Sequence, residues 1–149
     1  IDDTGIVIQW HIVGMFFPSL FVGKLISRLG HRAIMVVGIF ALMICIGVSQ
    51  IDQTVAGYWV SLVALGVGWN FLFVSSTALL ITSYKDHEKY RAQAFNEFMV
   101  FGFQAIASLS AGWLLTATSW ATINLMSLPI LGTLLLTIWW SSKKTKPSY

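Results

Sequence analysis

Charged residues and cysteine are both scarce in this chain, and the two shortages exclude most soluble architectures. Only 10% of the 149 residues are Asp, Glu, Lys or Arg, whereas 56% are hydrophobic. A soluble domain normally carries about 25% charged residues, and its core could not hide so much apolar surface. The single cysteine, Cys45, excludes a disulfide within one chain. The composition therefore predicts an integral membrane protein in which Cys45 is a small apolar packing residue.

Catalytic and metal-binding patterns are also missing. The sequence contains no HExxH, CxxC, P-loop or Ser-His-Asp pattern in a credible context. Its three histidines, His11, His31 and His87, are divided between an apolar stretch and two polar segments. We therefore expect no enzyme activity, no metal site, no cofactor and no ATP-driven step.

Five apolar stretches are each long enough to cross a bilayer as a helix, which takes roughly 20 apolar residues. Barrel strands would be about 10 residues of alternating polarity, so helices are expected instead. Pro18 should bend the first stretch, and the long third and fourth should tilt or extend past the hydrocarbon. The fold class is therefore predicted as an all-α integral membrane protein. The expected spans are residues 4–22, 33–50, 55–83, 92–118 and 120–140.

The basic residues form three clusters, and the apolar stretches separate them. The connections that alternate with these clusters contain no Lys or Arg. This asymmetry is the positive-inside pattern, which predicts cytoplasmic clusters and a cytoplasmic tail at residues 141–149. We expect the net charge of +3 to orient the protein and to contact anionic lipid rather than nucleic acid. The clusters are Lys24, Arg28 and Arg32; Lys85, Lys89 and Arg91; and Lys143, Lys144 and Lys146.

The first residues are Ile1, Asp2 and Asp3, which match neither an initiator Met nor the basic start of a signal peptide. An acidic start is typical of an extracytoplasmic loop that is entered from an earlier helix. We therefore interpret the chain as the C-terminal piece of a longer protein.

Small residues recur inside the third and fourth expected spans. Lipid tails are as apolar as Leu, so helices associate in a membrane where small residues let their backbones approach. The pattern predicts that the spans pack as a bundle rather than standing as isolated anchors. The positions are Gly66 and Gly68, followed by Gly102, Ala105, Ala107, Ser108, Ala111 and Gly112.

A Gly- and Arg-rich segment, GKLISRLGHR, occupies residues 23–32 between the first two expected spans. It resembles the signature loop of the major facilitator superfamily, which has the form G-x-L-a-D-r-x-G-r-r. Ser27 stands where the stronger copy of that loop has Asp, as is common in the copy between helices 8 and 9. Taken alone, the segment also fits an ordinary cytoplasmic turn. The matching positions are Gly23, Leu25, Arg28, Gly30 and Arg32.

The resemblance extends over essentially the whole chain, since residues 10–19, 66–71 and 93–98 are similar to a bacterial subgroup of uncharacterised permeases. It implies that the five spans are helices 8 to 12 of a twelve-helix transporter in the bacterial inner membrane. The partner would be the missing N-terminal half of the same polypeptide. Two bundles would rock about a central cavity to give alternating access.

The glycines and arginines of the signature segment also suggest a conformational latch. Gly23 and Gly30 would permit a sharp cytoplasmic turn. Arg28 and Arg32 could hydrogen-bond the C-terminal carbonyls of a helix or a neighbouring carboxylate. Such contacts would stabilise one conformer of the rocking bundle.

Polar residues at membrane depth are costly, so each one is a functional candidate. Asn70 and Gln104 are expected at a similar depth, which a shared cavity would require. Each amide could bind solute or could join two helices. His11 could exchange a proton during transport or donate one structural hydrogen bond. The substrate-cavity candidates are Asn70, Gln104, His11, Gln9 and Trp69.

Glu97 is the only acid within the expected spans. It could couple solute movement to a proton gradient. It could equally be an interfacial acid that pairs with Lys89, Arg91 or an arginine of the signature segment.

These observations favour a secondary transporter that moves a small solute by alternating access. Proton coupling is expected, and efflux is slightly preferred over uptake. The competing hypothesis is an integral-membrane structural or assembly subunit that carries out no transport.

Overall fold

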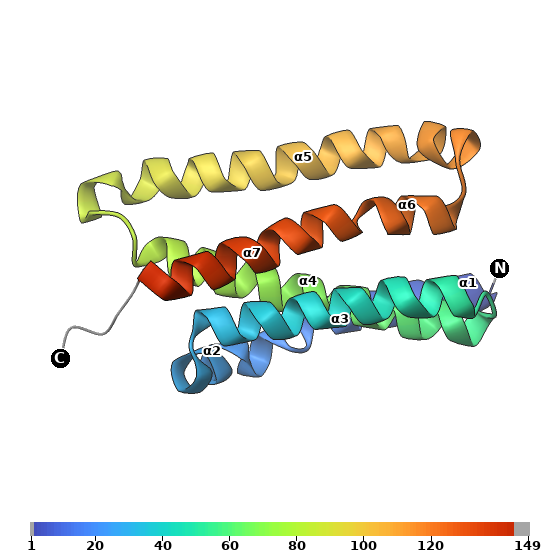
Figure 1. Ribbon diagram of the computed structural model, residues 1–149, viewed down its shortest axis with the longest axis horizontal. Coiled ribbons are helices and arrows are strands. Elements are labelled where there is room, and N and C mark those ends of the chain that lie inside the picture. Colours follow the sequence, from blue (N-terminus) through green and yellow to red (C-terminus); the bar gives the residue numbers. More distant parts are fainter. Residues whose placement is uncertain (1, 145–149) are drawn as a thin grey trace.

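The computed structural model describes residues 2–144, and every regular element in that range is helical. Five of its helices or helix pairs are long and apolar enough to cross a membrane. The predicted all-helical membrane fold with five spans is therefore confirmed. The elements are α1 (Asp2–Phe16), α2 (Ser19–Leu29), α3 (His31–Ile51), α4 (Val55–Ile81), the 3-10 turn η1 (Asp86–Glu88), α5 (Lys89–Ala117), α6 (Trp120–Met126) and α7 (Leu128–Lys144), as Figure 1 shows.

Two of the spans are interrupted helices. The first span, Thr4–Leu29, consists of α1 and α2, which meet at Phe17 and Pro18. Pro18 has no N–H, so the carbonyl of Gly14 loses the donor that a continuous helix would supply. The fifth span, Ala121–Lys143, consists of α6 and α7, which meet at Ser127. The first span is therefore interrupted at Pro18, where the sequence predicts a bend.

The signature segment is mostly helical, and this corrects the expectation of a loop over residues 23–32. α2 continues to Leu29, and α3 begins at His31. Gly30 alone makes the turn, with φ 83° and ψ 157°. An L side chain rarely adopts that conformation, so glycine is required at this position.

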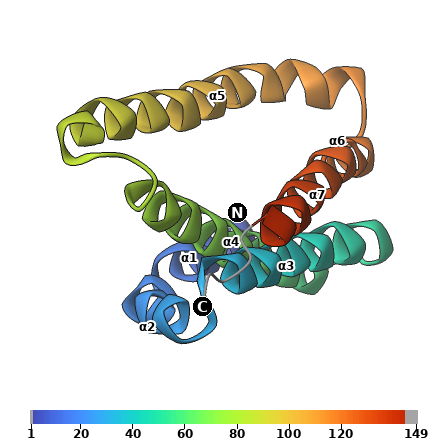
Figure 2. The same ribbon diagram turned by 60° about the vertical axis from the view of Figure 1, so that its left-hand side comes forward.

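α4 is the central helix of the packed part of the structure, and it lies between α1 and α3 (Figure 2). A Cβ atom at Gly66 would lie 2.5 Å from the carbonyl oxygen of His11 on α1. A Cβ atom at Gly68 would lie 2.8 Å from the carbonyl oxygen of Gly38 on α3. These separations are too short for any side chain, so the close approach of three backbones depends on glycine. The packing role predicted for Gly66 and Gly68 is confirmed.

Two apolar clusters reinforce these contacts. Val22, Ile34 and Phe71 join α2, α3 and α4 near the Gly30 turn. Ile39, Ile46 and Leu131 join α3 to α7. α7 therefore contacts α3 through residues other than those that contact α2.

α5 differs from the other spans because it has no buried residue. It packs on η1 and α6 at its two ends and crosses the molecule apart from the other helices (Figures 1 and 2). Cβ atoms added at Gly102 and Gly112 would meet nothing within 4 Å. Phe98 and Trp113 are 74% and 71% exposed. The prediction that the small residues of α5 pack within a bundle does not hold inside this chain.

Polar side chains fix two of the turns. The Thr54 hydroxyl caps α4 by accepting a bond from the Gly57 N–H at 3.3 Å. The side chain and the backbone N–H of Thr54 both bond Asp52 and hold the pKa of that carboxyl below its usual range. Ser119 caps α6 by accepting from the Thr122 N–H at 3.2 Å.

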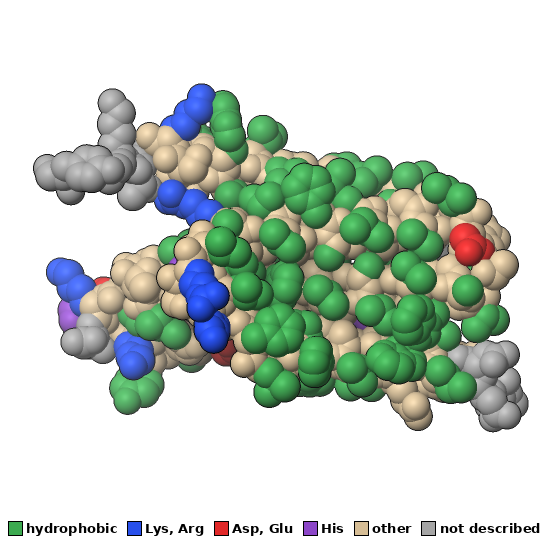
Figure 3. Space-filling view, turned by 90° about the horizontal axis from the view of Figure 1, so that it is seen from below, with side chains coloured by type: hydrophobic (Ala, Val, Ile, Leu, Met, Phe, Trp, Pro, Cys, Tyr) green, Lys and Arg blue, Asp and Glu red, His purple; other side chains and the backbone are tan. Residues whose placement is uncertain are grey.

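The basic residues gather at one end of the molecule, which Figure 3 shows in blue at the left. The Gly30 turn, the turn that contains η1, and the C-terminal end of α7 all lie there (Figure 1). If successive spans cross the membrane in alternate directions, the three basic clusters must lie on one side of it. The structure has this arrangement.

We predict that Gly66→Val and Gly68→Val each destabilise the packed helices by about 1–3 kcal/mol, because the added atoms would force backbones apart. The measurement is the thermal unfolding midpoint of the purified protein in detergent. Gly47→Val is the matched control, since a Cβ atom at Gly47 meets nothing within 4 Å. Equal midpoints for all three variants would contradict the glycine contacts.

Candidate functional site

A cavity of about 270 Å³ lies among α1, α2, α4 and α5, and we call it the Asn70 cavity. Most of its wall is aromatic or aliphatic, with three polar side chains added. An apolar pocket with few polar groups is the usual form of a small-molecule site. The lining residues are Met15, Phe16, Ser19, Trp69, Asn70, Phe73, Val74, Phe101 and Gln104.

Asn70 is 5% exposed and ties α4 to the break in the first span. Its Nδ2 donates to the carbonyl oxygen of Met15 at 2.6 Å and to the Ser19 hydroxyl at 2.5 Å. These two acceptors flank Pro18, where the regular helical hydrogen bonding of the first span is interrupted. Asn70 therefore joins both sides of the break.

The other amide atom of Asn70, Oδ1, is buried and has no hydrogen-bond partner within the described residues. The orientation of the amide follows from the neighbours, because a carbonyl oxygen such as that of Met15 accepts and cannot donate. A buried acceptor without a donor costs about 1–3 kcal/mol. Asn70, a residue of the cavity wall, thus keeps an unpaired acceptor that is enclosed in this conformation.

Aromatic rings form the wall beside Asn70. The rings of Trp69 and Phe73 are stacked, with centroids 6.0 Å apart and an interplanar angle of 10°. Residues 69, 70 and 73 share one side of α4 because helical neighbours recur at three- and four-residue intervals. A flat aromatic surface therefore lies on the same side of α4 as Asn70.

α5 supplies Phe101 and Gln104 from across the cavity. Glu97, Phe101 and Gln104 follow the i, i+4, i+7 spacing that places residues on one helix face. Glu97 is half-buried and makes no ion pair in the part of the chain that the structure describes. By this spacing Glu97 shares the helix face of Phe101 and Gln104, about one turn from Phe101, but it is not among the residues that line the cavity.

The structure brings together three of the five predicted cavity residues, Asn70, Gln104 and Trp69. Gln9 and His11 are not among those that line it. His11 Nδ1 instead lies 2.7 Å from the carbonyl oxygen of Leu62, which links α1 to α4. Gln9 is exposed on α1.

Sequence reasoning missed the rest of the wall. Ser19 and Met15 lie on either side of Pro18, and Phe73 and Phe101 are three residues from Asn70 and Gln104. Helical spacing from the two amides was the signal that could have found the phenylalanines. Met15 contributes through its backbone, which carries no sequence signal.

The signature segment makes a contact of the latch type. The Arg32 Nη2 donates to the carbonyl oxygen of Ser141, in the last turn of α7, at 3.1 Å. A cation at a helix C-terminus is favourable because the helix dipole is negative there. Arg28 is exposed on the last turn of α2, and Gly23 lies inside that helix.

Metal binding has no support in the described range 2–144, where no group of three or more His, Cys, Asp or Glu residues could hold an ion.

The fold and the cavity define the class: a multi-pass membrane protein with a largely apolar pocket between its helices. The family model described as Major Facilitator Superfamily matches residues 2–149. The chain belongs to this family, whose members are membrane transporters and not enzymes.

Three transporters are similar in sequence to the chain. The riboflavin transporter RfnT of Brucella anthropi is 38% identical over 136 residues, which cover 91% of this chain and 34% of RfnT. The uncharacterized MFS-type transporter YddS of Bacillus subtilis is 31% identical over 93% of this chain and 32% of its own length. YdeG, of the same description and organism, is 29% identical over 83% of this chain and 29% of its own length. The chain thus spans about a third of the length of these relatives. No solved structure matches it.

We predict that Asn70→Leu lowers the stability of the α1–α4 contact by about 1 kcal/mol, the typical value of a hydrogen bond between membrane helices. Thermal unfolding of the purified protein measures this. Gln104→Leu is the control from the same cavity, because Gln104 is exposed and makes no hydrogen bond among the described residues. A larger loss for Gln104→Leu than for Asn70→Leu would refute the structural role of Asn70.

Proposed function

We propose that the chain forms helices 8 to 12 of a twelve-helix secondary transporter. Its match to about a third of each relative supports this, because five of twelve helices are a comparable share. The signature segment, between the first and second spans, fits the connection between helices 8 and 9. The orientation that we propose puts the basic end in the cytoplasm of a bacterium.

The solute that we propose is a planar heteroaromatic compound with an amide-like edge, of which riboflavin is the example. The observation that carries this proposal is one cavity wall that holds both Asn70 and the stacked rings of Trp69 and Phe73. The Oδ1 of Asn70 has no partner among the described residues and would become available when the cavity widens. A flat ring system can stack on aromatic side chains. The imide N–H of an isoalloxazine ring can donate to an amide oxygen, and its carbonyls can accept from Gln104.

Access to the cavity depends on α5. The Oδ1 atom of Asn70 is closed to water in this conformation. Because α5 packs on η1 and α6 rather than on α4, a shift of α5 could widen the cavity without breaking the glycine contacts. Rocking of the two halves would supply such a shift in alternating access.

Glu97 is the group that we assign to proton coupling. It shares a helix face with Phe101 and Gln104, so its charge can act on whatever occupies the cavity. Protonation would neutralise this half-buried carboxylate and lower the cost of closing the cavity around it. Proton-coupled efflux is the direction that the permease resemblance favours.

We predict that Trp69→Ala and Gln104→Leu each reduce riboflavin transport by the full-length protein about five- to thirtyfold, because each removes a contact of roughly 1–2 kcal/mol. Transport of labelled riboflavin into inverted vesicles is the measurement, normalised to protein in the membrane. Trp113→Ala is the control, since Trp113 is exposed and lies outside the cavity wall.

The results separate the competing hypotheses. Saturable transport that both cavity variants lose supports the proposed site. Transport of riboflavin that neither variant changes would remove the Asn70 cavity from the solute path. No transport of riboflavin or related ring compounds by the unaltered protein would favour a structural or assembly subunit.

We predict that Glu97→Gln abolishes net transport driven by a pH gradient but retains exchange of labelled for unlabelled solute, because exchange needs no net proton movement. Vesicle assays with and without an imposed gradient measure the two modes. Glu88→Gln is the matched control, since Glu88 is an exposed acid in η1. Gradient-driven transport that survives in Glu97→Gln would exclude Glu97 as the coupling group.

A further inference from the structure

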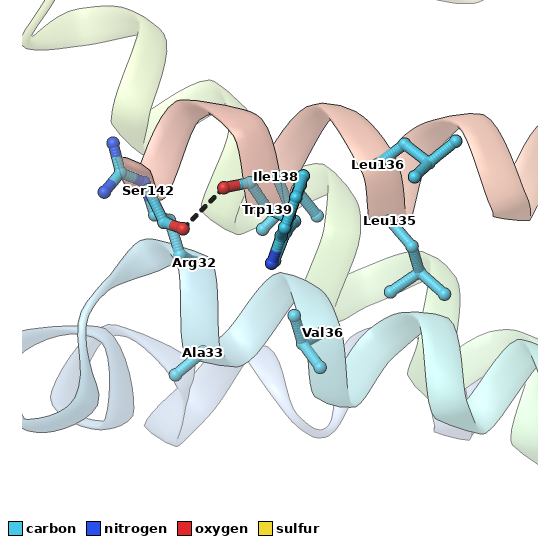
Figure 4. A pocket seen from close by; sticks show the side chains of 8 residues that line it. All are labelled: Arg32, Ala33, Val36, Leu135, Leu136, Ile138, Trp139 and Ser142. Carbon is cyan, nitrogen blue, oxygen red and sulfur yellow. Dashed lines mark hydrogen bonds between the residues drawn. The ribbon is translucent and has the colours of Figure 1, made fainter. Parts of the chain in front are cut away.

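A second hollow lies between the beginning of α3 and the end of α7 (Figure 4). We call it the α3–α7 groove. Its volume is about 760 Å³, within the range of sites that hold small molecules. It belongs to neither the Asn70 cavity nor the solute path proposed above, because none of its lining residues is shared with that cavity.

The floor of the groove is aliphatic. Val36 comes from α3, and Leu135 and Leu136 come from α7 (Figure 4). Leu136 is 65% exposed, although α3 and α7 pack through Leu131 and Ile39 nearby. An exposed aliphatic surface in a membrane protein is suited to a hydrocarbon chain.

One end of the groove is polar and cationic. Figure 4 shows Arg32 and Ser142 at this end, away from Leu135 and Leu136. The Ser142 hydroxyl bonds the Trp139 carbonyl at 2.6 Å, so Ser142 is held against its own helix. Lys143 Nζ lies 3.7 Å from the centre of the Trp139 ring. Lys143, which is not itself a lining residue, thus lies against a tryptophan of the wall that is 57% exposed, and Arg32 is a second cation in that wall.

The position of this end matches the level of lipid headgroups. It lies at the end of the molecule where the Lys and Arg side chains gather (Figure 3). Tryptophan is enriched at the membrane–water interface, and basic residues there attract anionic lipid. No Asp or Glu lines the groove, so no acidic side chain in its wall opposes an anion.

We propose that the α3–α7 groove binds an anionic phospholipid. One acyl chain would lie along Val36, Leu135 and Leu136. The phosphate would lie at the cationic end, where the guanidinium of Arg32 and the ammonium of Lys143 would contact it.

The aliphatic floor and the cationic end together favour an anionic phospholipid over other ligands. A free phosphate would make no use of the aliphatic floor. A zwitterionic phospholipid would fill the floor, but its headgroup carries a cation that weakens the attraction to Arg32 and Lys143. The bound lipid would contact α3 and α7 together. It would therefore stabilise the contact through which the Arg32 side chain caps α7.

The first test uses the unaltered full-length protein in a mild detergent. Phosphatidylglycerol and phosphatidylcholine with identical acyl chains are added, and bound lipid is counted by native mass spectrometry. We expect about tenfold tighter retention of phosphatidylglycerol, as one or two charge-assisted contacts would give. Glycerol phosphate, which has no acyl chain, should not bind. Equal retention of the two lipids, or binding of glycerol phosphate alone, would overturn the proposal.

The second test locates the lipid with three variants. Arg32→Gln removes a headgroup contact, and Val36→Trp fills the groove while it leaves every cation in place. Arg28→Gln is the matched control, because it removes one charge from the same end of the molecule but lies outside the groove. We expect the first two to lose the tightly held phosphatidylglycerol and Arg28→Gln to keep it.

The Arg32→Gln variant also loses its bond to Ser141, so its folding is checked by the unfolding midpoint. Val36→Trp carries the test if Arg32→Gln is unstable. Retention of phosphatidylglycerol by a folded Val36→Trp protein would overturn the placement. Loss in Arg28→Gln equal to that in Arg32→Gln would show a general charge effect and would overturn it as well.

Discussion

The approach of the α4 backbone to two neighbouring backbones is the contact on which the rest of the structure depends. Gly66 allows α1 to reach α4, and Gly68 allows α3 to reach it from the other side. In lipid there is little hydrophobic gain from helix association, so close packing and polar contacts must supply the stability. The distance set by Gly66 is what lets the Asn70 amide reach the carbonyl of Met15. The wall of the Asn70 cavity follows from the same spacing.

Two polar side chains fix how far α1 and α4 are shifted along each other. His11 meets the backbone of Leu62, and Asn70 meets the backbone of Met15, so α1 and α4 run in the same direction with two fixed points. Both bonds involve backbone carbonyls on the neighbouring helix. They would survive most substitutions at Met15 or Leu62, whereas neither survives replacement of its side-chain member by an aliphatic residue.

The spans were readable from the sequence because apolar length is a strong signal, and the packing of Gly66 and Gly68 followed from residue size. The helical structure of residues 23–29 could not be read from the sequence. Lys24 and Arg28 suggested a loop, yet long basic side chains remain solvated at the end of a membrane helix. Only Gly30 carried the true turn signal, since its positive φ excludes other residues. In the candidate site, similar depth correctly placed Asn70 and Gln104 together. Their partners could not be predicted, because a carbonyl such as that of Met15 becomes available through the break at Pro18.

α5 is held at its ends, with no buried side chain between them. Because of this, selection on the cavity wall and selection on helix packing can act on different residues of α5 but act together on α4. Replacements at Phe101 or Gln104 alter the cavity without disturbing the glycine-packed helices, so they can accumulate one at a time. Replacements on α4 must preserve the glycine contacts and the cavity wall together. Changes in the shape of the cavity would therefore arise first on α5, while α4 preserves the helix packing.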